Sequence, residues 1–169
     1  ASSRSFPKEI QPSRWPAITR NFQAFPTGSA SNSEISSAIS GTLAGRALRA
    51  APLALASQIV QRTGCAMLAQ YSNGRIERGA GRVPITRTPA PVDEGVAAFK
   101  EARHVILIGA KVPAPMFGYP GKPDFLMQPG ARLVELTSPG DDLHATLKEL
   151  AARVGALSES PIVDTAREL

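Results

Sequence analysis

The stretch RHVILIGAKVPAPMFGYPGKPD, residues 103–124, decides the fold class. It opens with the apolar run 105–108, and Gly109 follows directly, so the pattern predicts a buried strand that ends in a tight turn. A nucleotide-binding α/β domain would continue with a helix, but prolines stand at positions 113, 115, 120, 123 and 129. Proline fixes φ and lacks an amide donor, so we expect a rigid loop that presents Phe117 and Tyr119 rather than a phosphate cradle.

Helical and strand patterns alternate on both sides of this stretch. We expect strands at 37–43, 65–70, 104–108 and 132–137, and helices at 51–63, 93–102 and 141–154. Pro52 in a first turn and Gly64 after a last turn are typical of helix boundaries. Short apolar strands separated by helices predict an α/β fold, namely a Rossmann-like parallel sheet with helices on both faces.

The N-terminal residues 1–33 differ in composition from the rest of the chain. They contain seven serines and four basic residues but a single acid, Glu9. Two interpretations remain open: a disordered or loosely docked tail, or an organelle transit peptide, which is typically rich in Arg and Ser and poor in acids. We expect the folded domain to span 34–157 and residues 158–169 to be a linker or tail.

Composition excludes several classes of function. The net charge is +5, but Lys and Arg are scattered and aromatic residues make up 5%, so we expect no nucleic-acid partner. No apolar run approaches the roughly 20 residues that cross a bilayer, so we expect no membrane partner. Cys65 is the single cysteine, which suits a reducing, cytoplasmic setting. Neither it nor the two histidines, His104 and His144, forms a catalytic or metal-binding pattern, so we expect neither kind of site.

The candidate binding residues lie in loops that we expect at the carboxyl ends of the strands, 40–46, 71–91 and 109–123. In the second loop, GRIERGAGRVP interleaves arginines with glycines, a pattern that can bind phosphate or carboxylate, and Glu77 could orient one of those arginines. The alternative is a solvated loop that makes salt bridges within a larger assembly. The candidates for a nucleotide or flavin site are Gly41, Gly45, Arg78, Gly79, Gly81, Arg82 and Gly109.

Four segments together resemble the central domain of thiamine-diphosphate-dependent enzymes. They are GRALR (45–49), RIERGAGRVP (75–84), HVILIGAKVPAPMFGYPGKPD (104–124) and LKELAARVGA (147–156). The branch that the chain resembles contains acetolactate synthase large-subunit-like and benzoylformate decarboxylase-like proteins. The resemblance covers about residues 40–156, and its most specific parts are Glu-Arg-Gly-Ala-Gly and Tyr-Pro-Gly-Lys-Pro.

The resemblance implies a fold of the DHS-like NAD/FAD-binding type with six parallel strands, and FAD in some relatives. It also implies a structural role between a pyrimidine-binding and a pyrophosphate-binding domain, in a homo-oligomer that acts on 2-keto acids. Thiamine diphosphate and Mg²⁺ would then bind to the full-length enzyme only.

The metal-binding motif of that family is absent from this chain. Gly140-Asp141 is followed by Asp142 rather than by glycine, and no asparagine follows Asn73. We therefore expect a domain without activity of its own. Two alternatives remain: a stand-alone FAD- or adenine-nucleotide-binding module, and an orphan regulatory or interaction protein.

Overall fold

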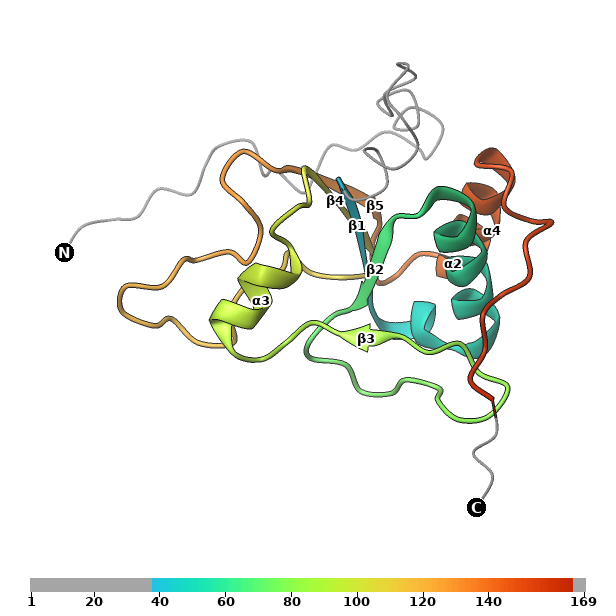
Figure 1. Ribbon diagram of the computed structural model, residues 1–169, viewed down its shortest axis with the longest axis horizontal. Helices are drawn as coiled ribbons and strands as arrows, with labels where there is room; N and C mark the ends of the chain where they lie inside the picture. Colours follow the sequence, from blue (N-terminus) through green and yellow to red (C-terminus); the bar gives the residue numbers. More distant parts are fainter. Residues whose placement is uncertain (1–37, 166–169) are drawn as a thin grey trace.

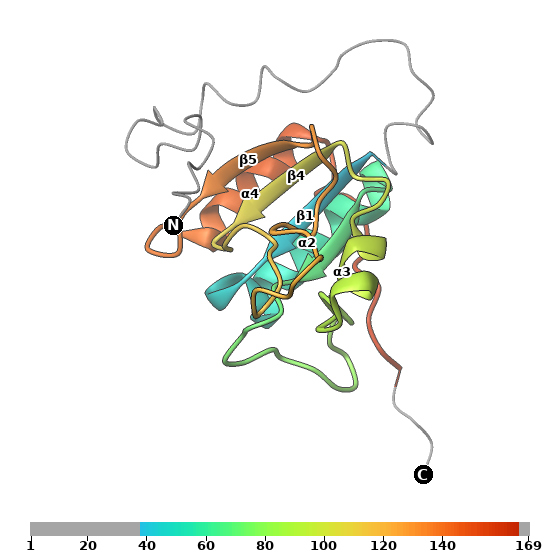
Figure 2. The ribbon, with the colours of Figure 1, turned by 90° about the vertical axis from the view of Figure 1, so that its left-hand side faces the viewer.

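The computed structural model describes residues 38–165. Their strands form one sheet of five parallel strands in the order β3-β2-β1-β4-β5. Figure 2 shows β1, β4 and β5 side by side. The elements are β1 (Ile39–Leu43), the 3₁₀ helix η2 (Gly45–Leu48), α2 (Ala50–Thr63), β2 (Ala66–Ala69), β3 (Thr86–Arg87), α3 (Val92–Ala98), β4 (His104–Ile108), β5 (Arg132–Thr137) and α4 (Leu143–Arg153). The order matches that of doubly wound sheets. The predicted Rossmann-like α/β fold is confirmed, whereas the predictions for residues 1–37 lie outside the described residues.

Helices cover both faces of the sheet, as predicted. α2 and α4 lie on one face, and α3 together with the connection between β4 and β5 lies on the other (Figure 1). β4 alternates accordingly: Ile106 and Ile108 pack in the core beneath α2 and α4, and Val105 and Leu107 pack in the core beneath α3. An aliphatic strand buried on both faces explains why residues 105–108 are so apolar.

The structure corrects three details of the prediction. The segment 71–91, expected to be all loop, contains β3, which pairs with β2 through Leu68 and Ala69. So short a strand exists because its neighbour provides hydrogen-bonding partners, which no local pattern reveals. α3 ends at Ala98 rather than at residue 102, and the buried Phe99 forms its C-terminal boundary. The described residues form five strands, where the resemblance implied six.

Two aspartates after β5 have different roles at the start of α4. Asp141, the predicted first residue of that helix, accepts hydrogen bonds from the amide of Ser138 (2.8 Å) and the hydroxyl of Thr137 (3.0 Å). Asp142 is the N-cap, and its carboxylate accepts from the amides of His144 and Ala145. Both carboxylates therefore stabilise the turn and the helix start.

The segment that follows α4, residues 156–165, runs back along α2 and is called here the C-terminal strap (Figure 1). The Gln58 side chain donates to the Glu159 carbonyl at 2.7 Å, and the Ile162 amide donates to the Ser57 hydroxyl at 2.9 Å. Residues 158–165 are thus attached to the domain by hydrogen bonds. Within the described part of the chain, the helices are too short or too polar to span a bilayer.

Candidate functional site

The carboxyl ends of β1, β2 and β4 lie side by side, and hydrogen bonds join the loops that leave them. The Ala44 amide donates to the Ile108 carbonyl at 3.2 Å, and the Gln70 amide donates to the Leu43 carbonyl at 2.8 Å. The Gln70 side-chain oxygen in turn accepts from the Lys111 amide at 2.6 Å. Gln70 therefore connects all three strand ends at the edge where sheets of this type bind ligands.

A cavity of about 250 Å³, called here the carboxyl-edge cavity, opens at this edge on the α3 face of the sheet. One side is polar and consists of residues 70–72 with Thr42, Thr88 and Lys111. The other side is largely apolar and consists of residues 112–116 with Leu126. The proline-rich loop therefore lines this cavity, although it offers few amide donors.

The glycines predicted to bind a ligand lie in different local surroundings, and only Gly109 is closely packed. Gly41 lies inside β1 rather than in the loop after it, and a Cβ there would lie 3.4 Å from Cγ of Met67. Gly109 has a φ of +63°, and a Cβ there would approach the Leu143 side chain of α4 to 2.7 Å. Gly45 opens η2, and a Cβ there would meet nothing within 4 Å.

Glu77 orients an arginine, but not one of those in its own loop. Its carboxylate accepts from the Ala50 amide at 3.1 Å and pairs with the Arg49 guanidinium at 3.6 Å. Its own amide donates to the Leu48 carbonyl at 3.2 Å. Glu77 thus caps α2 from a distant segment. Through this residue the segment RIERGAG is bonded to the end of the segment GRALR. A phosphate at this helix start would have to displace a carboxylate.

The arginine-glycine loop, residues 74–82, is held by the C-terminal strap. The Gly81 amide donates to the Asp164 carbonyl at 2.9 Å, and the Asp164 amide donates to the Arg82 carbonyl at 2.8 Å. Arg78 reaches the Ile85 carbonyl at 3.5 Å, and Gly79 accepts from the Arg82 amide at 3.0 Å. Residues 74–82 do not line the carboxyl-edge cavity. The seven predicted residues are therefore not brought into one site, and nucleotide binding by them stays a prediction.

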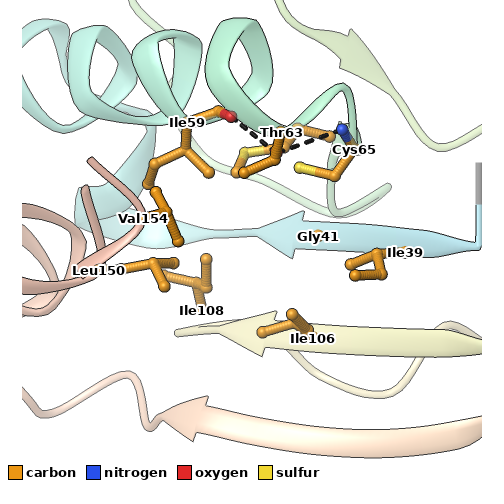
Figure 3. A pocket seen from close by; sticks show the side chains of 10 residues that line it. Ile39, Gly41, Ile59, Thr63, Cys65, Ile106, Ile108, Leu150 and Val154 are labelled. Carbon is orange, nitrogen blue, oxygen red and sulfur yellow. Dashed lines mark hydrogen bonds between the residues drawn. The ribbon is translucent and has the colours of Figure 1, made fainter. Parts of the chain in front are cut away.

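A second cavity, of about 150 Å³, lies beneath α2 and α4 and is lined almost entirely by apolar side chains (Figure 3). The Thr63 hydroxyl donates to the Ile59 carbonyl at 2.7 Å and accepts from the Cys65 amide at 3.3 Å. Cys65 lines this cavity and is buried, and desolvation raises the pKa of its thiol. The prediction that Cys65 belongs to the core is confirmed, and a protonated, buried thiol is a poor nucleophile.

The described residues do not bring together the side chains that usually hold a metal ion. Residues 38–165 contain no cluster of three or more His, Cys, Asp or Glu side chains that could hold one. Asp141 and Asp142 follow Gly140 and are the part of the sequence most similar to the Gly-Asp-Gly metal motif. Both carboxylates accept hydrogen bonds from amides at the start of α4. The residues present therefore do not fit thiamine diphosphate with Mg²⁺.

The three loops predicted to hold the site, 40–46, 71–91 and 109–123, contribute most of the residues that line the carboxyl-edge cavity. Gln70 and Leu126 lie outside those loops, and Thr42 was not among the predicted binding residues. A signal existed in ISGTL, residues 39–43, because the central strand of a sheet places two hydroxyls where aliphatic side chains are usual. Ser40 and Thr42 share one face of β1, and both hydroxyls are buried without a hydrogen-bond partner in the structure.

No protein-family model and no solved structure matches the chain. Over 126 residues, or 74% of the chain, it is 35% identical to a Mycobacterium tuberculosis (strain ATCC 25618 / H37Rv) protein named "Putative acetolactate synthase large subunit IlvX". The matched segment makes up 24% of that protein, so this chain spans about a quarter of the length of its curated relative. The chain is thus similar to one part of an acetolactate synthase-like protein.

Proposed function

We propose that this chain is the central, structural domain of a thiamine-diphosphate-dependent, acetolactate synthase-like enzyme that acts on 2-keto acids. One observation carries the proposal: the chain is 35% identical to a segment that forms 24% of a protein named as an acetolactate synthase large subunit. The α/β fold agrees with the domain that the sequence resembles. The domain would work within a longer polypeptide or assembly, and alone it would be inactive.

The described residues do not fit thiamine diphosphate with Mg²⁺, and this supports a structural rather than a catalytic role for the chain. The described residues contain no group of three or more His, Cys, Asp or Glu side chains that could hold a metal ion. The sequence has Gly140-Asp141-Asp142 instead of the Gly-Asp-Gly motif of the family that it resembles. Flanking pyrimidine- and pyrophosphate-binding domains would bind thiamine diphosphate and Mg²⁺ in a homo-oligomer. This chain would contribute a rigid scaffold between them.

The tip of the proline-rich loop is a suitable contact for such neighbouring domains. Met116, Phe117 and Tyr119 are exposed by 52%, 62% and 46%, which is unusual for large apolar side chains. The rings of Phe117 and Tyr119 stand edge to face with centroids 6.2 Å apart. At the base of the loop the Leu126 amide donates to the Pro113 carbonyl at 3.0 Å, so the aromatic tip projects from a closed and rigid base.

The alternative of a stand-alone flavin or adenine-nucleotide module receives less support. Dinucleotide sites place a pyrophosphate at the helix start after the first strand. Here Glu77 already caps that helix, and Gly41 lies within the strand. A co-purified yellow colour would nevertheless favour this alternative over a structural role.

A chimera tests the proposed function. The segment of the M. tuberculosis protein that matches this chain is replaced by residues 34–165, so that the C-terminal strap stays attached to α2 and to the arginine-glycine loop. We expect the chimera to assemble as the parent protein does and to keep thiamine-diphosphate-dependent turnover of a 2-keto acid. The purified chain alone should show no turnover of pyruvate or benzoylformate with thiamine diphosphate and Mg²⁺.

The control is the same chimera with Phe117→Ser and Tyr119→Ser, which removes the apolar tip without touching the core. This variant should fold but assemble less well. A folded chimera that fails to assemble, or turnover by the isolated chain, would contradict the proposal.

A further inference from the structure

We propose that the carboxyl-edge cavity binds a small monocarboxylate with an apolar body. This goes beyond the proposed function, because a structural domain needs no ligand of its own. The inference stands on four features of the cavity: a buried hydroxyl without a partner, one cation, no acid, and an apolar wall.

The unpartnered hydroxyl belongs to Thr42, which lies near the carboxyl end of β1. Its side chain is 1% exposed, lines the cavity, and has a hydroxyl oxygen with no hydrogen-bond partner. Burying a hydroxyl without a partner is unfavourable, so native proteins rarely keep one without a reason. A ligand oxygen in the cavity would accept its proton.

The charge of the lining favours an anion. Lys111 lines the cavity, and none of the described lining residues is acidic. Within residues 38–165, Lys111 forms no ion pair with an Asp or Glu. Its backbone is fixed because its amide donates to the Gln70 side chain at 2.6 Å. One ammonium together with one hydroxyl suits a single carboxylate.

The opposite wall favours an apolar body on that carboxylate. It contains Val112, Pro113, Pro115 and Met116 on the proline-rich loop, and Leu126 from the loop's base. Prolines hold this wall rigid and supply no amide donors. At about 250 Å³ the cavity lies just below the usual range of ligand pockets, about 300–1,000 Å³, so the ligand is small.

A phosphate or nucleotide fits the cavity less well. Phosphate sites use several amide donors at a helix start, but the connection from β4 to β5 contains no helix. A dianion would also face a single lysine. The chemistry therefore points to a monocarboxylate.

Benzoate is the probe, and benzamide, which has the same shape without the charge, is its control. The full chain is titrated with each compound at pH 7, and binding is followed by NMR shifts of the Thr42, Gln70 and Lys111 amides. We expect benzoate to bind with a dissociation constant in the millimolar range and benzamide to bind at least about tenfold more weakly.

Three variants locate the site. Thr42→Val removes the hydroxyl at constant volume, and Lys111→Met removes the cation; each should weaken benzoate binding about tenfold. Ser40→Ala is the matched control, because the Ser40 hydroxyl is equally buried and unpartnered on the same strand but does not line the cavity. It should leave the affinity unchanged.

The melting temperature shows whether each variant folds. Thr42→Val should melt at or above the temperature of the parent chain, since it removes a buried unpaired hydroxyl. If the Thr42→Val variant does not fold, the Lys111→Met variant alone decides the outcome. Lys111 is exposed, so its substitution should leave the fold intact.

Three results would overturn the inference: no benzoate binding, equal binding of benzamide, or affinities unchanged in both Thr42→Val and Lys111→Met. The chimera experiment is independent of all three. A binding failure and a failure of the proposed function therefore cannot be confused.

Discussion

Glu77 joins two segments that lie far apart in the sequence, and its effect can be measured at the scale of one residue. Glu77→Ala removes the carboxylate that caps the Ala50 amide and pairs with Arg49. Losing a helix cap costs about 1 kcal/mol in the free energy of unfolding, which urea denaturation measures. Glu101→Ala is the control, since its ion pair with Lys100 is exposed, and it should change stability by less than about 0.5 kcal/mol. Equal effects would contradict the capping role.

Gly109 ends β4 in a backbone conformation that side chains rarely adopt. Gly109→Ala meets a left-handed φ of +63° and the Leu143 side chain at 2.7 Å, so we expect a loss of about 2–4 kcal/mol in unfolding free energy. Gly121→Ala has a φ of +73° but open space, and should cost only about 1–2 kcal/mol. Gly118→Ala meets neither constraint and should be close to neutral. Thermal melts of the three variants separate the two causes. Gly121→Ala reports the backbone strain alone, and the additional loss in Gly109→Ala reports the steric overlap with Leu143.

Cys65 should react slowly in the folded protein, because burial raises the pKa of its thiol. A thiol reagent at pH 7 should modify it slowly in buffer and rapidly in urea. A raised folded pKa stabilises the fold below the unfolded value, about 8.5, and this contribution is lost as pH rises above it. The stability of the parent chain should therefore fall more steeply above this pH than that of Cys65→Ala. Rapid labelling of the folded chain would contradict the buried position.

At the scale of elements, the C-terminal strap ties α2 to the arginine-glycine loop. Ser57→Ala removes the hydroxyl that accepts from the Ile162 amide. We expect faster hydrogen exchange at Ile162 and also at Gly81, whose amide is bonded to Asp164 of the strap. Ser158→Ala, an exposed change in the strap, should alter neither amide. Faster exchange at Ile162 alone would show that the strap does not hold the loop.

The proline-rich connection between β4 and β5 stands where sheets of this type usually have a helix. Parallel neighbours such as β4 and β5 need a crossover, and here an irregular segment provides it, anchored by the buried Leu126. A Cβ at Gly95 of α3 would lie 3.0 Å from the Leu126 side chain, so loop and helix are in close contact. Lys122 adds an ion pair to Asp93 at 2.7 Å, although it is largely exposed and contributes little. Rigidity of the tip therefore rests mainly on Leu126 and the prolines.

At the scale of the whole molecule, the observed sheet agrees with the one predicted from the sequence. The prediction succeeds because strand and helix patterns depend on neighbouring residues only. The apolar run 105–108 and the stripe on α4 follow directly from strand and helix periods. The presence of only two histidines and one cysteine is likewise a matter of composition.

The sequence by itself determined the fold class, most strand and helix positions, and the position of Cys65 in the core. It did not determine which distant groups meet. The cap that Glu77 places on α2, the strap on the arginine-glycine loop, and the cavity formed by Thr42, Gln70 and Lys111 come from contacts between segments many residues apart. Periodicity reports only whether a side chain faces inward. Which partner it finds there depends on how the chain crosses over the sheet, and the tertiary structure alone decides that.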